Sequence, residues 1–222
     1  MSKWRSEWAQ KKCEVATKLN RGDSGGSYGE AVLILCAALS AFAAEVWPGT
    51  GIDRKRFVHL LKRFSLPRLS CTRISVPILA AHLRQKRKRS ALRRLQRAYL
   101  NFGHSRVVTG HDVDKTEREI MSVCPRLSRR EIRDCSYAAL LYRELRSAYV
   151  HEYRPGKKAD SWPMTQRDDA QVSYLNWVND PDRHIHFHAS WLLELVAEVA
   201  KALDQLPSRL PARKPKRWWV DG

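Results

Sequence analysis

Apolar residues recur at helical spacing along much of the chain, and these stretches predict most of its secondary structure. A loose apolar stripe predicts a helix over residues 3–20, and a nearly continuous apolar run predicts a central helix over residues 28–47. A narrower stripe predicts a helix over residues 54–64, with Asp53 as its N-cap, because an aspartate can accept a hydrogen bond from a free backbone N–H. These helices would form the first part of a bundle.

The second half of the chain combines helical and strand patterns. Ser128 and Glu131 fit a capping box, which predicts the start of a helix that continues to about residue 153. Residues 78–100 also have helical character, whereas the glycines within residues 101–114 indicate a loop. Residues 172–177 are rich in aromatic and β-branched side chains, residues 184–188 alternate strictly, and an Asn-Asp-Pro turn lies between them, which predicts a small β-hairpin. A last amphipathic helix follows over residues 192–206.

The predicted fold is therefore mainly α: a helical bundle of about four to five core helices with a small β-hairpin before the last helix. Residues 1–206 would form one domain, in which residues 65–127 are a basic insertion or arm. Residues 207–222 would form a basic, disordered tail. The longest apolar run, residues 31–46, is shorter than the ~20 residues that a membrane-spanning helix needs. We interpret it as a buried core helix and expect no membrane contact.

Composition adds a prediction about the partner. The chain has 41 Lys and Arg against 23 Asp and Glu, which gives a formal net charge of +18. A polyanion would neutralise this excess, so the predicted partner is nucleic acid, and RNA in particular; an anionic membrane surface is the weaker alternative. The five cysteines form no C-x-x-C pair and the first twenty residues lack an apolar signal segment, so we expect a cytoplasmic protein.

The positive charge is concentrated in one run that contains no acidic residue. The candidate nucleic-acid-binding residues in it are Arg84, Lys86, Arg87, Lys88, Arg89, Arg93, Arg94 and Arg97. They would follow a phosphate backbone, although a solvated helix face has the same composition. Residues 213–219 combine basic side chains with two tryptophans, which would suit stacking on a single strand; disorder is the alternative.

Three histidines alternate along the second strand of the predicted hairpin: His184, His186 and His188. Alternate residues of one strand are ~6.5–7 Å apart, so a single zinc ion could not reach all three without bending of the strand. We therefore favour a polar sheet face that is open to RNA, and expect no metal and no cofactor.

The candidate catalytic residues are Arg146 and, five positions later, His151. RNA can be cut without metal when its 2′-hydroxyl attacks the adjacent phosphate. Histidine suits the proton transfer because its unperturbed pKa is about 6.5, and arginine suits the developing phosphate charge because its planar fork can bind two oxygens. In the alternative interpretation Arg146 pairs with Glu45, and His151 is a helix-terminal residue favoured by the macrodipole.

The run of residues 140–154 resembles the motif helix of the HEPN superfamily, helical bundles that share an Arg-x4–6-His motif. It is closest to one HEPN-like group found on plasmids and other mobile elements, and residues 53–58 are similar to a second block of that group. The resemblance implies metal-independent cleavage of single-stranded RNA by Arg146 and His151, with a homodimer bringing two motifs into one cleft. Ser147 departs from the Asn, Asp or His that often follows the arginine in active members.

Helix geometry limits how the two motif residues can act together. At about 100° per residue, Arg146 and His151 lie roughly 140° apart around a straight helix. Either the helix loosens near His151 or a second chain completes the site. The candidate neighbours of the site are Ser147, Tyr149, Tyr142 and Glu45.

The resulting hypothesis is a metal-independent endoribonuclease that cuts single-stranded RNA or tRNA, as a toxin or phage-defence effector with a cognate antitoxin or operon partner. The alternative is a HEPN-like module that binds RNA or nucleotide without cutting, which the serine after the arginine favours. A third hypothesis is an adaptor that binds another protein.

Overall fold

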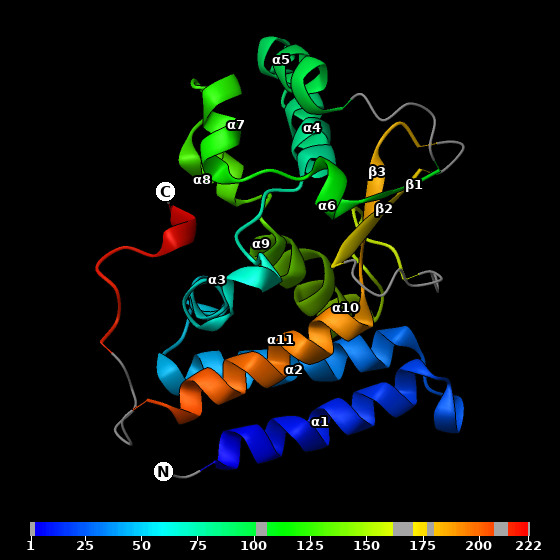
Figure 1. The fold of residues 1–222 in the computed structure, drawn as a ribbon, viewed down its shortest axis with the longest axis vertical. Helices are drawn as coiled ribbons and strands as arrows, with labels where there is room; N and C mark the ends of the chain where they lie inside the picture. Colours follow the sequence, from blue (N-terminus) through cyan, green and yellow to red (C-terminus); the bar gives the residue numbers. More distant parts are fainter. Residues whose placement is uncertain (1–2, 101–105, 162–170, 177–179, 207–212, 222) are drawn as a thin grey trace.

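The computed structural model describes residues 3–100, 106–161, 171–176, 180–206 and 213–221. The core helices are α1 (Trp4–Asn20), α2 (Tyr28–Val46), α3 (Asp53–Phe64), α11 (Ala189–Asp204) and one continuous helix made of α9 (Tyr137–Leu140), the π-helical segment η3 (Leu141–Ser147) and α10 (Ala148–Glu152). In Figure 1, α1, α2 and α11 form the bottom layer, and α3 and the α9–α10 helix lie above it. The predicted mainly α bundle is confirmed.

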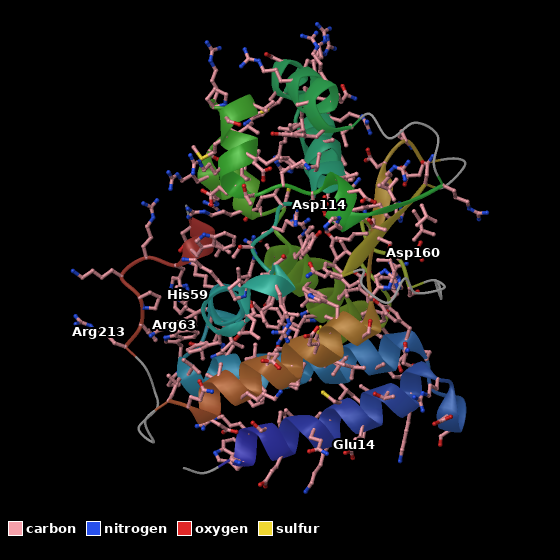
Figure 2. All side chains as sticks on the ribbon, viewed as in Figure 1. Glu14, His59, Arg63, Asp114, Asp160 and Arg213 are labelled. Atoms are coloured by element: carbon pink, nitrogen blue, oxygen red, sulfur yellow. The ribbon has the colours of Figure 1, made fainter. Side chains whose placement is uncertain are left out.

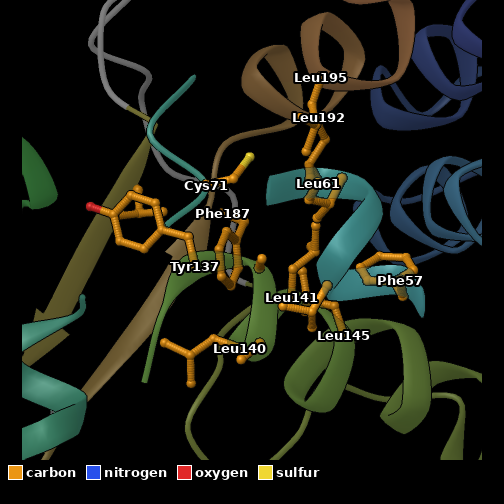
Figure 3. Close-up of a cluster of buried hydrophobic side chains, with 14 of the residues drawn as sticks. Phe57, Leu61, Cys71, Tyr137, Leu140, Leu141, Leu145, Phe187, Leu192 and Leu195 are labelled. Atoms are coloured by element: carbon orange, nitrogen blue, oxygen red, sulfur yellow. The ribbon is translucent and has the colours of Figure 1, made fainter. Parts of the chain in front are cut away.

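The core lies between these two layers. Leu61 of α3, Leu141 and Leu145 of η3, and Leu192 and Leu195 of α11 are all fully buried. Figure 3 shows these leucines meeting from three elements that are distant in the sequence. Burial of one such side chain stabilises the folded chain by about 1.5–3 kcal/mol, so this contact region fixes α9–α10, henceforth called the motif helix, against α3 and α11.

Helix α2 is the centre of the bundle. It is the one helix, in the part of the chain that the structure describes, whose length and hydropathy would allow it to cross a membrane. Here it packs against α1, α3, α11 and η3, and residues such as Leu35, Leu39 and Phe42 are fully buried. The structure therefore places it as the core helix that the sequence predicts.

Residues 65–135 form a second group of short helices. These are the 3₁₀ turn η2 (Pro67–Leu69), α4 (Val76–Gln85), α5 (Arg89–Tyr99), α6 (Gly110–Val113), α7 (Glu117–Val123) and α8 (Arg129–Arg133). Figure 1 shows α4, α5, α7 and α8 together as a lobe at the top. The prediction of one helix over residues 78–100 is wrong, because Arg87 adopts a φ of 55° and the chain turns there. Within the basic insertion or arm, α4 is largely buried.

The sheet contains the predicted hairpin and one strand more. Strand β2 (Val172–Asn176) pairs antiparallel with β3 (Arg183–Phe187), with Tyr174 opposite Ile185. Strand β1 (Val107–Thr109) pairs with the other edge of β2. It arises from the segment predicted to be a loop, which is too short there to show an alternating pattern.

Two predicted helix starts need correction. The capping box of Ser128 and Glu131 is present, but the helix that it starts ends at Arg133. Ser136 then caps a new helix by accepting a hydrogen bond from the Ala139 N–H. Asp53 is not an N-cap; it lies inside α3 and pairs with Arg56.

The expected disordered tail is wrong for its last residues. The short turn η4 (Trp219–Asp221) lies against α3 and α8. Trp218 contacts Trp47 with ring centroids 5.8 Å apart, and Val220 is buried. Arg133 lies over the Trp219 ring at 5.2 Å. These tryptophans therefore pack within the protein instead of forming a free stacking platform. Residues 207–212 lie outside the described residues.

A buried hydrogen-bond network joins the lobe to the sheet and the core. Oδ1 of the fully buried Asp114 accepts from the Val76 N–H at 2.9 Å, and Oδ2 accepts from the Tyr137 hydroxyl at 2.6 Å. The Tyr174 hydroxyl of β2 contacts the same Oδ2 and lies 2.8 Å from Ser75 Oγ. Burial raises the pKa of Asp114 to about 7. Figure 2 shows Asp114 where the upper lobe meets the rest of the molecule.

Candidate functional site

The structure places Arg146 in the π-helical segment of the motif helix. Its Nε donates to Ser40 Oγ of α2 at 3.3 Å, and its guanidinium lies 5.3 Å from the Tyr142 ring centroid. The pairing with Glu45, considered in the alternative interpretation, is absent, because Glu45 binds Arg5 at 2.6 Å. A π-segment inside an α-helix often occurs at functional sites. Arg146 is partly exposed.

His151 lies in α10, one turn beyond Arg146, and is exposed. Among the described residues, none forms a hydrogen bond with its side chain. Arg146 is turned toward α2, whereas His151 is exposed, and no hydrogen bond among the described residues joins the two side chains. Completion of a shared site by a second chain stays a prediction.

Of the candidate neighbours, Tyr142 and Tyr149 lie on the face of the motif helix that packs on the bundle. The Tyr142 ring contacts Phe57 of α3 at 5.4 Å. Tyr149 is buried against α2, where a Cβ on Gly29 would lie 2.9 Å from the Tyr149 ring. Gly29 therefore permits the close approach of the two helices. Ser147 is partly buried and forms no N-cap bond.

The chain after the motif helix is held by Glu144, a buried residue of η3. The Gly156 N–H donates to the Glu144 carbonyl oxygen at 2.7 Å, and the Lys158 N–H donates to Glu144 Oε2 at 3.2 Å. Tyr153, with a φ of 53°, turns the chain out of the helix toward these contacts.

We expect Gly156→Ala to destabilise the protein by about 1–3 kcal/mol, the usual cost of overpacking. The added Cβ would lie 2.4 Å from Glu144 Oε2 and 3.0 Å from Glu144 Cα. Urea unfolding measures the change, and Lys157→Ala, at the exposed neighbour, is the control that should differ from wild type by less than about 0.5 kcal/mol. Equal stability of Gly156→Ala and wild type would mean that this contact is not close in solution.

A hollow of about 790 Å³ opens beside the end of the motif helix. Its walls come from the turn after α1, the start of α2, the end of α10, and β3. Tyr28, Tyr149 and Tyr153 give it aromatic surface, and the exposed Arg21 and Arg154 give its rim positive charge. Its volume is within the range of about 300–1,000 Å³ for small-molecule sites. Aromatic rings beside cations suit an unstacked base and its phosphate.

His186 forms part of the inner wall of this hollow and is only 4% exposed. Its ring stacks on Tyr28 at 4.9 Å, and its Nδ1 lies 3.2 Å from the Asp160 carbonyl oxygen. Since a carbonyl can only accept, Nδ1 carries the proton and Nε2 is left as an acceptor. Burial lowers the pKa of His186, so the ring stays neutral and can accept a hydrogen bond from a base N–H.

The rim of the hollow is ordered by Glu30 at the start of α2. The Tyr153 hydroxyl donates to Glu30 Oε1 at 2.8 Å, and Ser27, the N-cap of α2, donates to the other oxygen. These hydrogen bonds, first from Ser27 and then from Tyr153, lower the pKa of Glu30. Arg154 is held beside the rim by Glu152 at 2.9 Å.

The structure divides the basic run into two groups. Arg84 of α4 pairs with Asp182 directly before β3, and Lys88 pairs with Glu131 of α8, so one cation joins the lobe to the sheet and the other joins two parts of the lobe. The other members, which are also exposed, are Lys86 and Arg87 in the turn and Arg89, Arg93, Arg94 and Arg97 on α5. Among the described residues, no carboxylate pairs with the four arginines of α5.

The expected polar sheet face of three histidines that is open to RNA is wrong, because only His186 of the three lines the hollow. His186 and His188 are 4% and 1% exposed, and His184 pairs with Asp180 at 2.8 Å. Burial lowers the pKa of His188 to about 4, and its Nε2 lies 2.8 Å from Ser173 Oγ. Within the described ranges, His, Cys, Asp and Glu side chains form no group of three or more that could hold a metal ion.

No protein-family model, curated protein or solved structure matches this chain. The relation to the HEPN superfamily therefore stays a prediction from two sequence blocks. Those blocks pack against each other in the structure, through Phe57 and Tyr142.

Sequence reasoning missed most of the hollow. Arg21 and Tyr28 flank a glycine-rich turn, Tyr153 and Arg154 follow the motif, and His186 belongs to the hairpin. The available signal was the aromatic-basic pair directly after His151. Nothing in the sequence pattern joins that pair to the start of α2, which lies more than 120 positions earlier in the chain.

Proposed function

We propose that this protein binds single-stranded RNA, with the hollow beside the motif helix receiving one unstacked base. The observation that carries the proposal is the wall of that hollow: tyrosine rings next to the cations Arg21 and Arg154. Rings accept the face of any base, cations accept the flanking phosphates, and His186 Nε2 accepts an N–H from the edge of the base. The net charge of +18 supports a polyanionic partner.

The test is the affinity of a fluorescein-labelled 12-nucleotide RNA of mixed sequence, measured by anisotropy. We expect Tyr153→Ala to weaken binding about tenfold, since stacking on one aromatic side chain contributes about 1–3 kcal/mol per base. The double variant Arg21→Glu/Arg154→Glu should weaken it further and reduce its salt dependence.

The matched control is Lys3→Glu/Lys11→Glu, which makes the same charge change at exposed positions toward the other end of α1. It should weaken RNA binding by less than threefold. If the control and the Arg21 and Arg154 variant weaken binding equally, only overall charge matters and the hollow is not the RNA site.

The second candidate function is cleavage of that RNA without metal, in a homodimer. It is favoured by the exposure of His151 at the end of the motif helix and by the partial exposure of Arg146. His151 would transfer protons and Arg146 would hold the scissile phosphate, each from a different subunit. A role as a toxin or defence effector, with a cognate antitoxin, follows as part of the same proposal.

A further inference from the structure

A tight turn of three residues joins α4 to α5. The Lys86 N–H donates to the His82 carbonyl oxygen at 2.9 Å, and the Lys88 N–H donates to the Leu83 carbonyl oxygen at 2.9 Å. Between them Arg87, with a φ of 55°, reverses the direction of the chain. Helices of ten and eleven residues joined by such a turn have the dimensions of a helix-turn-helix unit.

Helix α4 is buried in the lobe, whereas α5 contacts the lobe along one face only. Leu79 and Leu83 anchor α4 at 0% exposure, whereas Leu95 is the only residue of α5 that is fully buried. Two hydrogen bonds hold the inner edge of α5: Cys124 Sγ lies 3.5 Å from the Ala91 carbonyl oxygen, and the Tyr99 hydroxyl donates to the Glu119 carbonyl oxygen at 3.2 Å. The lobe therefore presents α5 in a fixed orientation.

The outer face of α5 carries one arginine per helical turn. Arg89, Arg93 and Arg97 are spaced four residues apart, or ~6 Å along the axis. Exposed Ser90 and Gln96 lie beside them, and α5 contains no acidic residue. The face thus offers cations for phosphates together with the side chains that read base edges: arginine for guanine and glutamine for adenine.

This face suits a duplex groove better than a single strand or an RNA helix. Single-strand sites need stacking rings, and the only aromatic residue of α5, Tyr99, is turned toward α7. The major groove of B-DNA is ~12 Å wide and admits an α-helix, whereas the major groove of A-form RNA is too narrow for one. We propose that α4, the turn and α5 form a helix-turn-helix unit that binds double-stranded DNA with α5 in the major groove.

The DNA site would be separate from the RNA site. In Figure 1, α5 lies at the top of the molecule, and the ends of α1 and α10 that line the hollow lie far below it. One chain can therefore hold a DNA duplex at one end and an RNA strand at the other.

Selection from a pool of duplex DNA with 20 randomised base pairs tests the proposal. We expect the protein to enrich one short sequence, and to bind that sequence as duplex DNA at least tenfold more tightly than as duplex RNA or as either single strand. Absence of an enriched sequence, or equal affinity for all four forms, would reduce α5 to a general polyanion-binding surface and overturn the proposal.

Variants of α5 complete the test on the selected duplex. Arg93→Glu/Arg97→Glu should lower the affinity at least thirtyfold and the neutral Arg93→Gln/Arg97→Gln at least tenfold, with unchanged melting temperatures because both positions are exposed. Lys3→Glu/Lys11→Glu and Tyr153→Ala should change it less than threefold. A loss caused equally by the Lys3 and Lys11 control would contradict the assignment, whatever the result for RNA.

Discussion

Replacing Asp114 by alanine is expected to destabilise the protein by about 3–5 kcal/mol, the largest stability change that the structure predicts. The substitution removes the acceptor for the Val76 N–H and the Tyr137 hydroxyl, both of which are buried. A buried donor without a partner costs about 1–3 kcal/mol, and the cavity adds to that. Since Asp114 joins the lobe to Tyr174 of the sheet, the change should loosen the lobe first. Urea unfolding measures it.

The pH dependence of stability has a definite sign at Asp114. Burial raises the pKa of its carboxyl from 3.8 to about 7 in the folded chain. The protonated form is satisfied, because Tyr174 donates its single proton to Ser75 and can then accept one from Asp114. The folded state therefore binds more protons than the unfolded state between these pKa values, and stability should fall as the pH rises from about 4 to about 7.

Asp114→Asn is the variant that isolates this effect, because it cannot ionise and keeps one acceptor oxygen. Its stability should depend less on pH across that interval than the stability of wild type. Asp23→Ala, at an exposed acid, is the control and should leave both stability and its pH profile nearly unchanged. A wild-type stability that does not fall relative to that of Asp114→Asn between pH 4 and pH 7 would show that the carboxyl is ionised throughout.

His151→Ala is expected to reduce RNA cleavage by about 100- to 1,000-fold, the usual effect of removing a positioned acid or base. The cleavage of wild type should persist in EDTA, because the 2′-hydroxyl is the nucleophile and the protein supplies only proton transfer and charge. The assay follows a labelled single-stranded RNA on a denaturing gel. His111→Ala removes another exposed histidine, far from the motif in the sequence, and should retain full activity.

Mixing inactive subunits tests the dimer that this cleavage needs. If Arg146 of one subunit acts with His151 of the other, a heterodimer of Arg146→Ala and His151→Ala contains one intact pair. Mixed variants should then recover activity that neither has alone. If no mixture recovers activity although both variants are folded and dimeric, the two residues act within one subunit. That result would contradict the dimer proposal, which the different orientations of Arg146 and His151 favour.

The sequence predicts the local elements well wherever one pattern dominates. The apolar run of α2 and the stripe of α11 follow the residues that these helices bury, and the β-branched and aromatic residues of β2 fit a strand whose first four residues are all buried. The fold class follows from these elements. The capping box at Ser128 also succeeds, because it depends only on neighbouring residues.

The interruptions and the hollow depend on distant contacts and could not be predicted in the same way. Arg87 replaces the glycine that usually marks a left-handed turn, so the break between α4 and α5 has no sequence signal. Ser136 and Asp134 interrupt a run that otherwise reads as one helix. Nothing in the sequence distinguishes Asp114 from an exposed aspartate, because its contacts with the Tyr137 and Tyr174 hydroxyls exist only in the folded chain.

The most direct test of the central claim is photo-crosslinking of the wild-type protein to a 12-nucleotide RNA that contains 4-thiouridine, followed by mass spectrometry of the crosslinked peptides. RNA bound in the hollow should crosslink to peptides that contain Arg21–Glu30 or Tyr149–Arg154. Crosslinks confined to α5 would contradict the account, since they would place RNA on the surface that we assign to DNA.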